Sequence, residues 1–227
     1  MTPDVAIVVA DGARSSRAAL DAAWPGWDRG RRFVVAADGG AAAASALSLP
    51  IDLVVGDMDS VAPELLASLR AADVAVEVWP RDKDASDTEL ALRSATGHAP
   101  GRIVILGAVG GGRLDHALAN VALLGLSELS GREVSLLDDA SRLQLATGPC
   151  EVSLEGRVGD LVSLLPLGGD VVGVRTDGLA FPLFDETLAV GSTRGLSNVR
   201  TAPTAHVRVD AGRLLIVEVV PPEEVHP

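Results

Sequence analysis

The stretch "DLVVGDMDSV", residues 52–61, joins a short apolar run to a glycine and to two aspartates one residue apart. The run has the length of a buried strand, and glycine and aspartate are typical of the loop that follows one. Two carboxylates about 4 Å apart repel by roughly 4 kcal/mol at an effective dielectric near 20. A positive group is therefore expected between Asp57 and Asp59, unless water keeps them apart.

Similar apolar runs recur through the first half of the chain and alternate with helical patterns. The runs occupy residues 5–10, 33–38, 74–79 and 102–108, and residues 133–137 would form a sixth strand. The helical patterns occupy residues 15–23, 40–47, 63–72, 86–95 and 115–129. This alternation predicts an α/β domain over residues 1–138, with a parallel sheet covered by helices on both faces.

The second half has a different pattern. From about residue 142 the chain shows short alternating runs separated by pairs such as "GP", "GG" and "DG", and no convincing helix of ten residues. These features predict an antiparallel sandwich or barrel over residues 142–227. The segment 138–142 separates the two predicted domains.

Composition excludes several classes of function. The 227 residues carry a formal net charge of −12, which argues against general binding to nucleic acid or to an anionic membrane surface. A small phosphorylated ligand stays compatible with this charge, since a divalent cation can lie between ligand and protein. The single cysteine allows no intrachain disulfide. With neither a signal-peptide pattern nor an apolar run of membrane-span length, a soluble cytoplasmic protein is expected.

The ends of the five predicted strands are rich in acidic residues and glycine. In open α/β sheets, ligands bind beyond the carboxyl ends of the strands. Any one such loop is explained by turn chemistry, whereas five at one sheet edge favour a site for metal and phosphate. Mg²⁺ is typically held by one or two carboxylates together with substrate phosphates, and Asp57 and Asp59 fit that role. The strand-end residues are Asp11, Gly12, Asp38, Gly39, Gly40, Asp57, Asp59, Ser60, Asp82, Lys83, Asp84, Asp87, Gly110, Gly111, Gly112, Arg113 and Asp115.

Several of these residues have a structural alternative. Asp59 or Ser60 could cap the next helix, and Ser86 with Glu89 fits a capping box. Asp87 would then lie in a first helical turn, from which it can also face the cleft.

The glycine-rich loop "GAVGGGRLDH", residues 107–116, precedes a helix, so its backbone N–H groups can approach an anion. Arg113 and Lys83 suit phosphate oxygens. Asp115 is either a cap-region carboxylate or a functional one, and His116 is more typical of a helix surface.

Six stretches together resemble the thiamine pyrophosphokinase family. They are "ADGG", "GDMDS", "DKDASDTELAL", "GAVGGGRLDHALAN", "GLAFPL" and "STRGLSN", in the family's order, across roughly residues 36–199. The resemblance implies a Rossmann-like α/β domain for nucleotide and metal, followed by a thiamine-binding β-sandwich. It also implies a homodimer with its sites at the subunit interface. The implied reaction is thiamine + ATP → thiamine diphosphate + AMP, with Mg²⁺ as cofactor.

The resemblance also assigns roles to residues. It implies metal binding by Asp57, Asp59 and Asp87, and catalysis by these three with Asp115 and Arg113. Asp115 is the candidate general base. The residues expected to contact ATP or thiamine are Asp38, Gly39, Lys83, Gly111, Gly112, Arg113, Ser197 and Asn198.

Two other functions stay open at this point. One is a pyrophosphokinase or a DxD-type nucleotide transferase that acts on another small hydroxylated heterocycle or sugar. The other is a nucleotide-binding protein without catalysis, although binding alone rarely needs so many aspartates in one cleft.

Overall fold

The computed structural model describes residues 2–221 and forms two compact units that meet between Asp139 and Ala140. This division falls inside the segment 138–142. The first unit mixes helices and strands, and the second is built of strands.

The first unit alternates strand and helix along the chain. Its elements are β1 (Val5–Val9), α1 (Arg17–Ala23), β2 (Arg32–Ala37), α2 (Gly40–Ala46), β3 (Leu53–Gly56), α3 (Pro63–Ala71), β4 (Ala75–Val78), α4 (Asp87–Gly97), β5 (Arg102–Leu106), α5 (Leu114–Leu123), the short 3₁₀ helix η1 (Ser127–Leu129) and β6 (Glu133–Leu137). The predicted strand–helix alternation is confirmed.

The strands of the first unit form a parallel sheet with β1 at its centre. β1 pairs with β2 on one side and with β5 on the other. The order within this unit is β6-β5-β1-β2-β3-β4. It differs from the usual dinucleotide-binding order 3-2-1-4-5-6, although both orders reverse direction at a switch point. Here the reversal lies between β1 and β5, which is where a ligand is expected.

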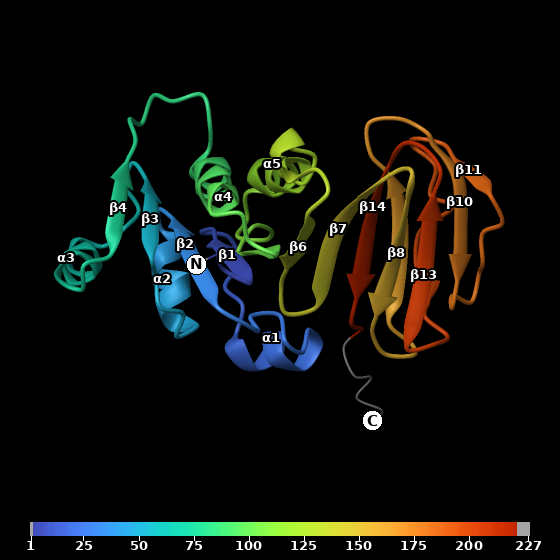
Figure 1. Ribbon diagram of the computed structural model, residues 1–227, viewed down its shortest axis with the longest axis horizontal. Helices are drawn as coiled ribbons and strands as arrows, with labels where there is room; N and C mark the ends of the chain where they lie inside the picture. Colours follow the sequence, from blue (N-terminus) through green and yellow to red (C-terminus); the bar gives the residue numbers. More distant parts are fainter. Residues whose placement is uncertain (1, 222–227) are drawn as a thin grey trace. The chain divides into compact units, whose positions relative to one another are not determined.

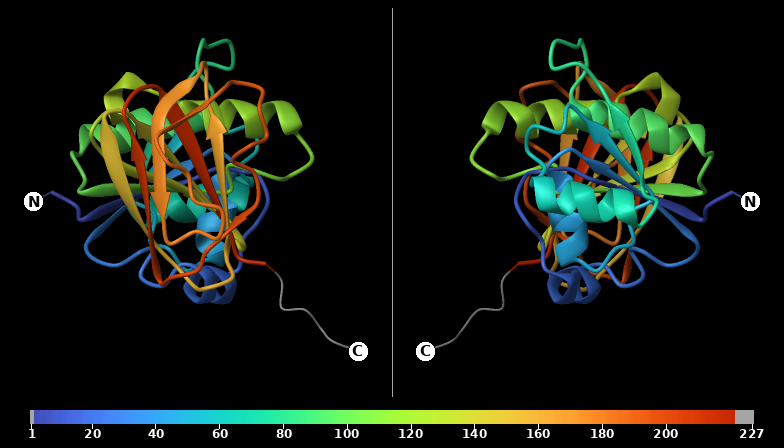
Figure 2. Two further views of the ribbon diagram at one scale, coloured as in Figure 1. Left: turned by 90° about the vertical axis from the view of Figure 1, so that its right-hand side faces the viewer. Right: turned by 90° about the vertical axis from the view of Figure 1, so that its left-hand side faces the viewer.

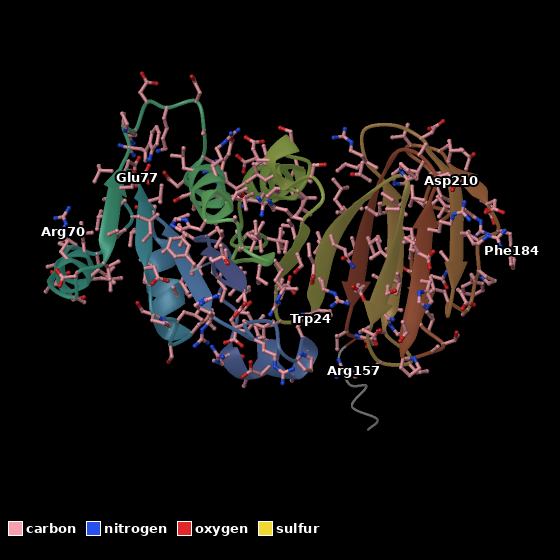
Figure 3. All side chains as sticks on the ribbon, viewed as in Figure 1. Trp24, Arg70, Glu77, Arg157, Phe184 and Asp210 are labelled. Carbon is pink, nitrogen blue, oxygen red and sulfur yellow. The ribbon has the colours of Figure 1, made fainter. Side chains whose placement is uncertain are left out.

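Helices cover both faces of this sheet, as the sequence predicts. Figure 1 shows α4 and α5 on one face and α1 and α2 on the other. Every residue of β1 is buried, and α4 packs through the small or aliphatic residues Ala91, Leu92 and Ala95. The edge elements α3 and β4, seen nearest the viewer in the right-hand view of Figure 2, contain no buried residue. In Figure 3 the side chains of Arg70 and Glu77 project from this edge.

The structure decides both of the capping alternatives, at the start of α4 and at the start of α3. Ser86 does cap α4, because its Oγ accepts a hydrogen bond from the backbone N–H of Glu89 at 3.2 Å. The side chain of Glu89 accepts from Arg93 at 3.0 Å. The suggestion that Asp59 or Ser60 caps α3 is wrong: the N-cap is Ala62, and Pro63 sets the first helical residue.

The second unit consists of two sets of four antiparallel strands that share one core. The orders are β12-β9-β14-β7 and β11-β10-β13-β8. Leu154 and Val207 from one sheet and Leu164 and Ile216 from the other are buried in that core. The strands are β7 (Ser141–Thr147), β8 (Cys150–Glu155), β9 (Leu161–Pro166), β10 (Val171–Asp177), β11 (Glu186–Leu188), β12 (Asn198–Val199), β13 (Thr204–Val209) and β14 (Arg213–Val219). The predicted antiparallel half is confirmed.

Within residues 2–221, none of the helices has both the length and the apolar composition needed to cross a membrane.

Candidate active site

A cleft of about 440 Å³ opens at the carboxyl ends of the strands in the first unit. Its walls come from the loops after β1, β2 and β5 and from the β4–α4 connection, so it lies at the switch point of the sheet. Five of the residues to which the resemblance assigns a role line it, namely Asp38, Lys83, Asp87, Gly111 and Arg113. Two neighbours of Arg113, Gly112 and Asp115, are not among the lining residues.

Three aspartates next to the cleft form a compact acidic cluster, hereafter the Asp38 cluster. It consists of Asp38 after β2 and of Asp57 and Asp59 after β3, and one carboxylate oxygen from each lies within 4.8 Å of the others. The loop is folded by local bonds: the N–H of Asp59 donates to Asp57 Oδ1 at 3.2 Å, and the N–H of Ser60 donates to Asp38 Oδ2 at 3.2 Å. The side chains therefore converge, because β2 and β3 are neighbours.

Asp38 is the buried member of this cluster. Its exposed fraction is 7%, and its Oδ1 has no hydrogen-bond partner among the described residues. Burial raises the pKa of this carboxyl, and the negative charges of Asp87 and Asp57 raise that pKa further. A buried carboxylate oxygen without a partner, beside two other carboxylates, suits a hard divalent cation.

Lys83 lies against the cluster in the β4–α4 connection. Its Nζ is 3.0 Å from Asp87 Oδ1 and 3.9 Å from Asp57 Oδ2, and only 11% of its side chain is exposed. Arg81, whose side chain is 83% exposed, approaches Asp59 from the solvent side at 2.8 Å. Asp87 thus forms an ion pair with the lysine, and Asp57 is both a member of the Asp38 cluster and a neighbour of the lysine.

Gly56, the last residue of β3, makes the close approach of these carboxylates possible. Its φ of +153° lies in a region that favours glycine. A Cβ at this position would lie 2.9 Å from the Cβ of Asp38 and 3.1 Å from Asp87 Oδ1. Any larger residue would therefore push Asp38 or Asp87 out of place.

The glycine-rich loop between β5 and α5 forms another wall. Gly110, Gly111 and Gly112 all have positive φ, which lets the backbone turn sharply before the helix begins. The loop is held from behind, since Asn120 donates from its side-chain amide to the carbonyl of Ala108 at 2.7 Å. The loop therefore leads into the N-terminus of α5, where free backbone N–H groups suit a phosphate.

Arg113 and Asp115 form an exposed pair at this helix start. The guanidinium donates two hydrogen bonds to the carboxylate, at 2.9 and 2.7 Å, and both side chains are 66% exposed. The guanidinium of Arg113 holds the pKa of Asp115 well below its usual range. A carboxylate with a low pKa is a weak proton acceptor, and an incoming anion would compete with it for Arg113.

The two residues singled out in the second unit differ in environment. Ser197 is exposed and has a φ of +55°. Asn198 is buried, and its side chain is bonded to the backbone of Phe181: Oδ1 accepts from the N–H at 2.9 Å, and Nδ2 donates to the carbonyl at 2.7 Å. Asn198 therefore fixes the backbone beneath the ring of Phe181, which is 62% exposed.

Some residues that line the cleft have no role among the site residues predicted from the sequence. Asp11 could be found from the sequence, because it follows β1 in the pattern "ADG". It packs against Gly39, where an added Cβ would lie 2.4 Å from Asp11 Oδ2. His116, which the sequence favours as a helix-surface residue, lines the cleft. Ser60, Thr88, His116 and Asn120 are further polar residues of the lining without an assigned role.

The chain matches two protein-family descriptions. Residues 27–134 match "Thiamin pyrophosphokinase, catalytic domain", and residues 150–214 match "Thiamin pyrophosphokinase, vitamin B1 binding domain". The two matches lie in the first and second units respectively.

Relatives and solved structures carry the same description. The chain is 30% identical over 151 residues to the thiamine pyrophosphokinase of Bacillus subtilis, covering 66% of this chain and 69% of the relative. It is 29% identical over 169 residues to thiamine pyrophosphokinase 1 of Oryza sativa, covering 70% of this chain and 63% of that longer relative. The crystal structure of the Bacillus subtilis protein superposes with a TM-score of 0.82, covering 96% of this chain and 100% of that chain at 22% identity.

Proposed function

The chain belongs to the thiamine pyrophosphokinase family, and on that premise we propose that it transfers the pyrophosphoryl group of ATP to the hydroxyl group of thiamine. The products are thiamine diphosphate and AMP. The observation that supports this most directly is the cleft at the sheet switch point, where the Asp38 cluster, Lys83 and a glycine-rich helix start lie together. The comparisons favour this reaction over a sugar transferase or a non-catalytic nucleotide-binding protein.

In the proposed reaction the hydroxyl oxygen of thiamine bonds to the β-phosphorus of ATP. The bond between that phosphorus and the oxygen bridging to the α-phosphorus breaks, and AMP leaves with the bridging oxygen. Such transfers depend mainly on positioning and charge neutralisation. Arg113 and Lys83 would neutralise phosphate charge. The hydroxyl proton passes to solvent or to Asp115, whose low pKa makes it a weak base.

We propose that the first unit is the catalytic, Rossmann-like domain and holds Mg²⁺ on Asp38, Asp57 and Asp59. The orphaned Oδ1 of Asp38 supports this ligand set. When bound, the ion would screen the negative charge of the phosphates from the acidic cleft. Asp87, also a predicted ligand, would act through Lys83 or share the ion.

We propose that the second unit is the thiamine-binding β-sandwich domain. The ring of Phe181 is exposed although its backbone is fixed by Asn198. An exposed aromatic ring on a fixed backbone suits contact with a ligand. Thiamine carries a cationic thiazolium ring, and such cations bind favourably over aromatic faces. The exposed Ser197 would supply a hydrogen bond beside it.

The protein is further proposed to be a cytoplasmic homodimer whose sites join the first unit of one chain to the second unit of its partner. Mixing Asp59→Asn with Asn198→Ala subunits is then expected to restore activity to about one quarter of wild type. About half of the dimers would be mixed, and one of their two sites would be intact, given random exchange. Activity is measured after subunit exchange has been verified. Recovery no greater than the background of the separate variants would contradict the shared site.

Replacing Arg113 with alanine is expected to impair the use of ATP much more than the binding of thiamine. Losing a charge-assisted hydrogen bond costs about 1.5–3 kcal/mol, so kcat/KM for ATP should fall by roughly 10- to 150-fold. Steady-state kinetics with each substrate varied in turn measures the effect. Arg175→Ala is the matched control, because Arg175 and Asp185 form a similar exposed pair in the second unit. Equal changes in the two variants would contradict a phosphate role for Arg113.

The proposed function has a direct test. The purified chain is incubated with ATP, Mg²⁺ and thiamine, and the products are separated by chromatography. AMP and thiamine diphosphate in equal amounts are expected. Formation of ADP instead would indicate a simple phosphoryl transfer, and the absence of any thiamine-dependent AMP would reject the proposal.

A further inference from the structure

Three charged side chains, Arg142, Arg200 and Glu218, meet inside the second unit and are hereafter the inner triad. Glu218 is 2% exposed, and its carboxylate accepts hydrogen bonds from Arg200 at 2.6 Å and from Arg142 at 2.5 and 2.8 Å. The guanidinium of Arg200 is fully buried and also donates to the carbonyl of Leu154. Such a triad calls for an explanation, because apolar residues of similar volume often leave a core equally stable or more stable.

The strand register connects the inner triad to the residue that fixes Phe181. Val162 of β9 pairs with Asn198 of β12 on one side and with Glu218 of β14 on the other. Glu218 pairs in turn with Arg142 of β7. Directly paired residues of neighbouring strands point to the same face of a sheet. A single row of side chains therefore runs from Asn198 to the inner triad.

Arg200 strengthens this connection through the backbone. It forms a β-bridge with Leu179, and two positions before it Asn198 bonds to the backbone N–H and carbonyl of Phe181. The segment that carries Phe181 is therefore attached to the segment that carries Arg200. The side chain of Arg200 ties both segments to Glu218 in the core.

We propose that the inner triad is a positioning device, which holds Phe181 and Ser197 in the one arrangement that binds thiamine. The inference rests on the proposed function for the identity of the ligand. Buried charges accept few partners and only in certain directions, so they define one arrangement where apolar contacts would allow several. Without the triad only a fraction of the molecules would be competent to bind, and the apparent affinity for thiamine would fall by that fraction.

The test replaces the whole triad with apolar residues, as Arg142→Met/Arg200→Met/Glu218→Leu in the full chain. Thermal melting should stay within a few degrees of the wild type, because no buried charge is left without a partner. Calorimetric titration with thiamine alone should give a Kd about tenfold higher, as expected if about one molecule in ten is competent. The KM for ATP should change by less than about threefold, a split that a general loss of stability would not produce.

A second carboxylate bonded to two arginines provides the matched control. Asp28 in the first unit forms ion pairs with Arg17 and Arg32. The control variant Arg17→Met/Asp28→Leu/Arg32→Met removes the same charges outside the second unit. Its Kd for thiamine should equal that of the wild type.

A folded triad variant with the wild-type affinity for thiamine would overturn the inference, as would an equal loss of affinity in the control. Arg200→Met/Glu218→Gln, which leaves Arg142 a neutral partner, is the second variant in case the triple replacement does not fold. The same loss of thiamine affinity is expected from it. If neither variant folds, the triad serves stability alone and the inference is rejected.

Amide hydrogen exchange separates this inference from the proposed function, because the measurement needs no ligand. The N–H of Ala180 donates to the carbonyl of Val199 at 2.8 Å, and the N–H of Phe181 donates to Asn198 Oδ1 at 2.9 Å. Both amides should exchange faster in the triad variant than in the wild type. If the wild type did not bind thiamine, the proposed function would fail and the exchange rates would still decide the inference. Thiamine turnover by the wild type, with equal exchange and affinity in the variant, would reject the inference alone.

Discussion

Asp57→Asn is expected to lower kcat by about 10²- to 10⁴-fold, because a bound metal ion contributes several kcal/mol to a charged transition state. Asp57 belongs to the Asp38 cluster and also contacts Lys83, so its loss disturbs both. The fold should survive, since removing one of several like charges relieves repulsion in the metal-free protein. Kinetics at saturating substrates and Mg²⁺, together with thermal melting, would measure both effects.

Asp84→Asn serves as the matched control for this substitution. Asp84 is an exposed aspartate of the β4–α4 connection and lies outside the cleft lining. Its replacement changes the net charge equally and should leave kcat nearly unchanged. If Asp57→Asn retained near-normal activity at limiting Mg²⁺, the metal role of the carboxylate would have to be abandoned.

Gly56→Ala is expected to reduce kcat by about 10²-fold, the loss associated with a misplacement of about 1 Å in a reacting constellation. The added Cβ would lie 2.9 Å from the Cβ of Asp38, closer than side-chain carbons can approach. Its backbone φ of +153° adds strain. Together these should cost about 1–3 kcal/mol of stability, or a decrease in Tm of several degrees.

The control for this prediction is Gly97→Ala. Gly97 is the last residue of α4, and nothing lies within 4 Å of the position that its Cβ would take. Alanine there should leave kcat unchanged and stabilise the helix by up to about 1 kcal/mol. A Gly56→Ala protein with wild-type kcat would show that Asp38 and Asp87 tolerate displacement, against the role given to this glycine.

Much of the fold could be predicted because the signals are local. The runs that became β1 and β5 are continuous and apolar, as expected for strands buried on both faces. Two short strands of the second unit, β11 and β12, were missed, since three and two residues are too few to show a period. The helical pattern over residues 115–129 predicts a longer helix than the structure has, because α5 ends at Leu123.

Other features depend on side chains that meet only in three dimensions. Arg200 and Glu218 are fully buried and form an ion pair at 2.6 Å inside the second unit. No sequence pattern shows that these two charges face each other. Glu218 stands in a run of apolar residues, "RLLIVEVV", that reads simply as a strand. Both charges of such a buried pair must be present, because either charge alone in the core would lower the stability of the fold.

The location of the candidate site could be predicted from the sequence, but not which of its charged side chains contact one another. All parallel strands end at one sheet edge, so the acidic loops had to lie near one another. Which carboxylates share a cation depends on strand order and loop folding. Asp38 joins Asp57 and Asp59 because β2 neighbours β3, whereas Asp87 reaches the group from the start of α4 and pairs with Lys83.

The presence of a single lysine limits where amine-directed reagents can modify the protein. Apart from the α-amino group, Lys83 is the only amine that an acylating or reductively alkylating compound can modify. Biotinylation, fluorescent labelling and coupling to amine-reactive surfaces would therefore address either the chain terminus or the cleft. A label introduced at Lys83 would report on any ligand that enters the cleft, and immobilisation through that residue would block the cleft.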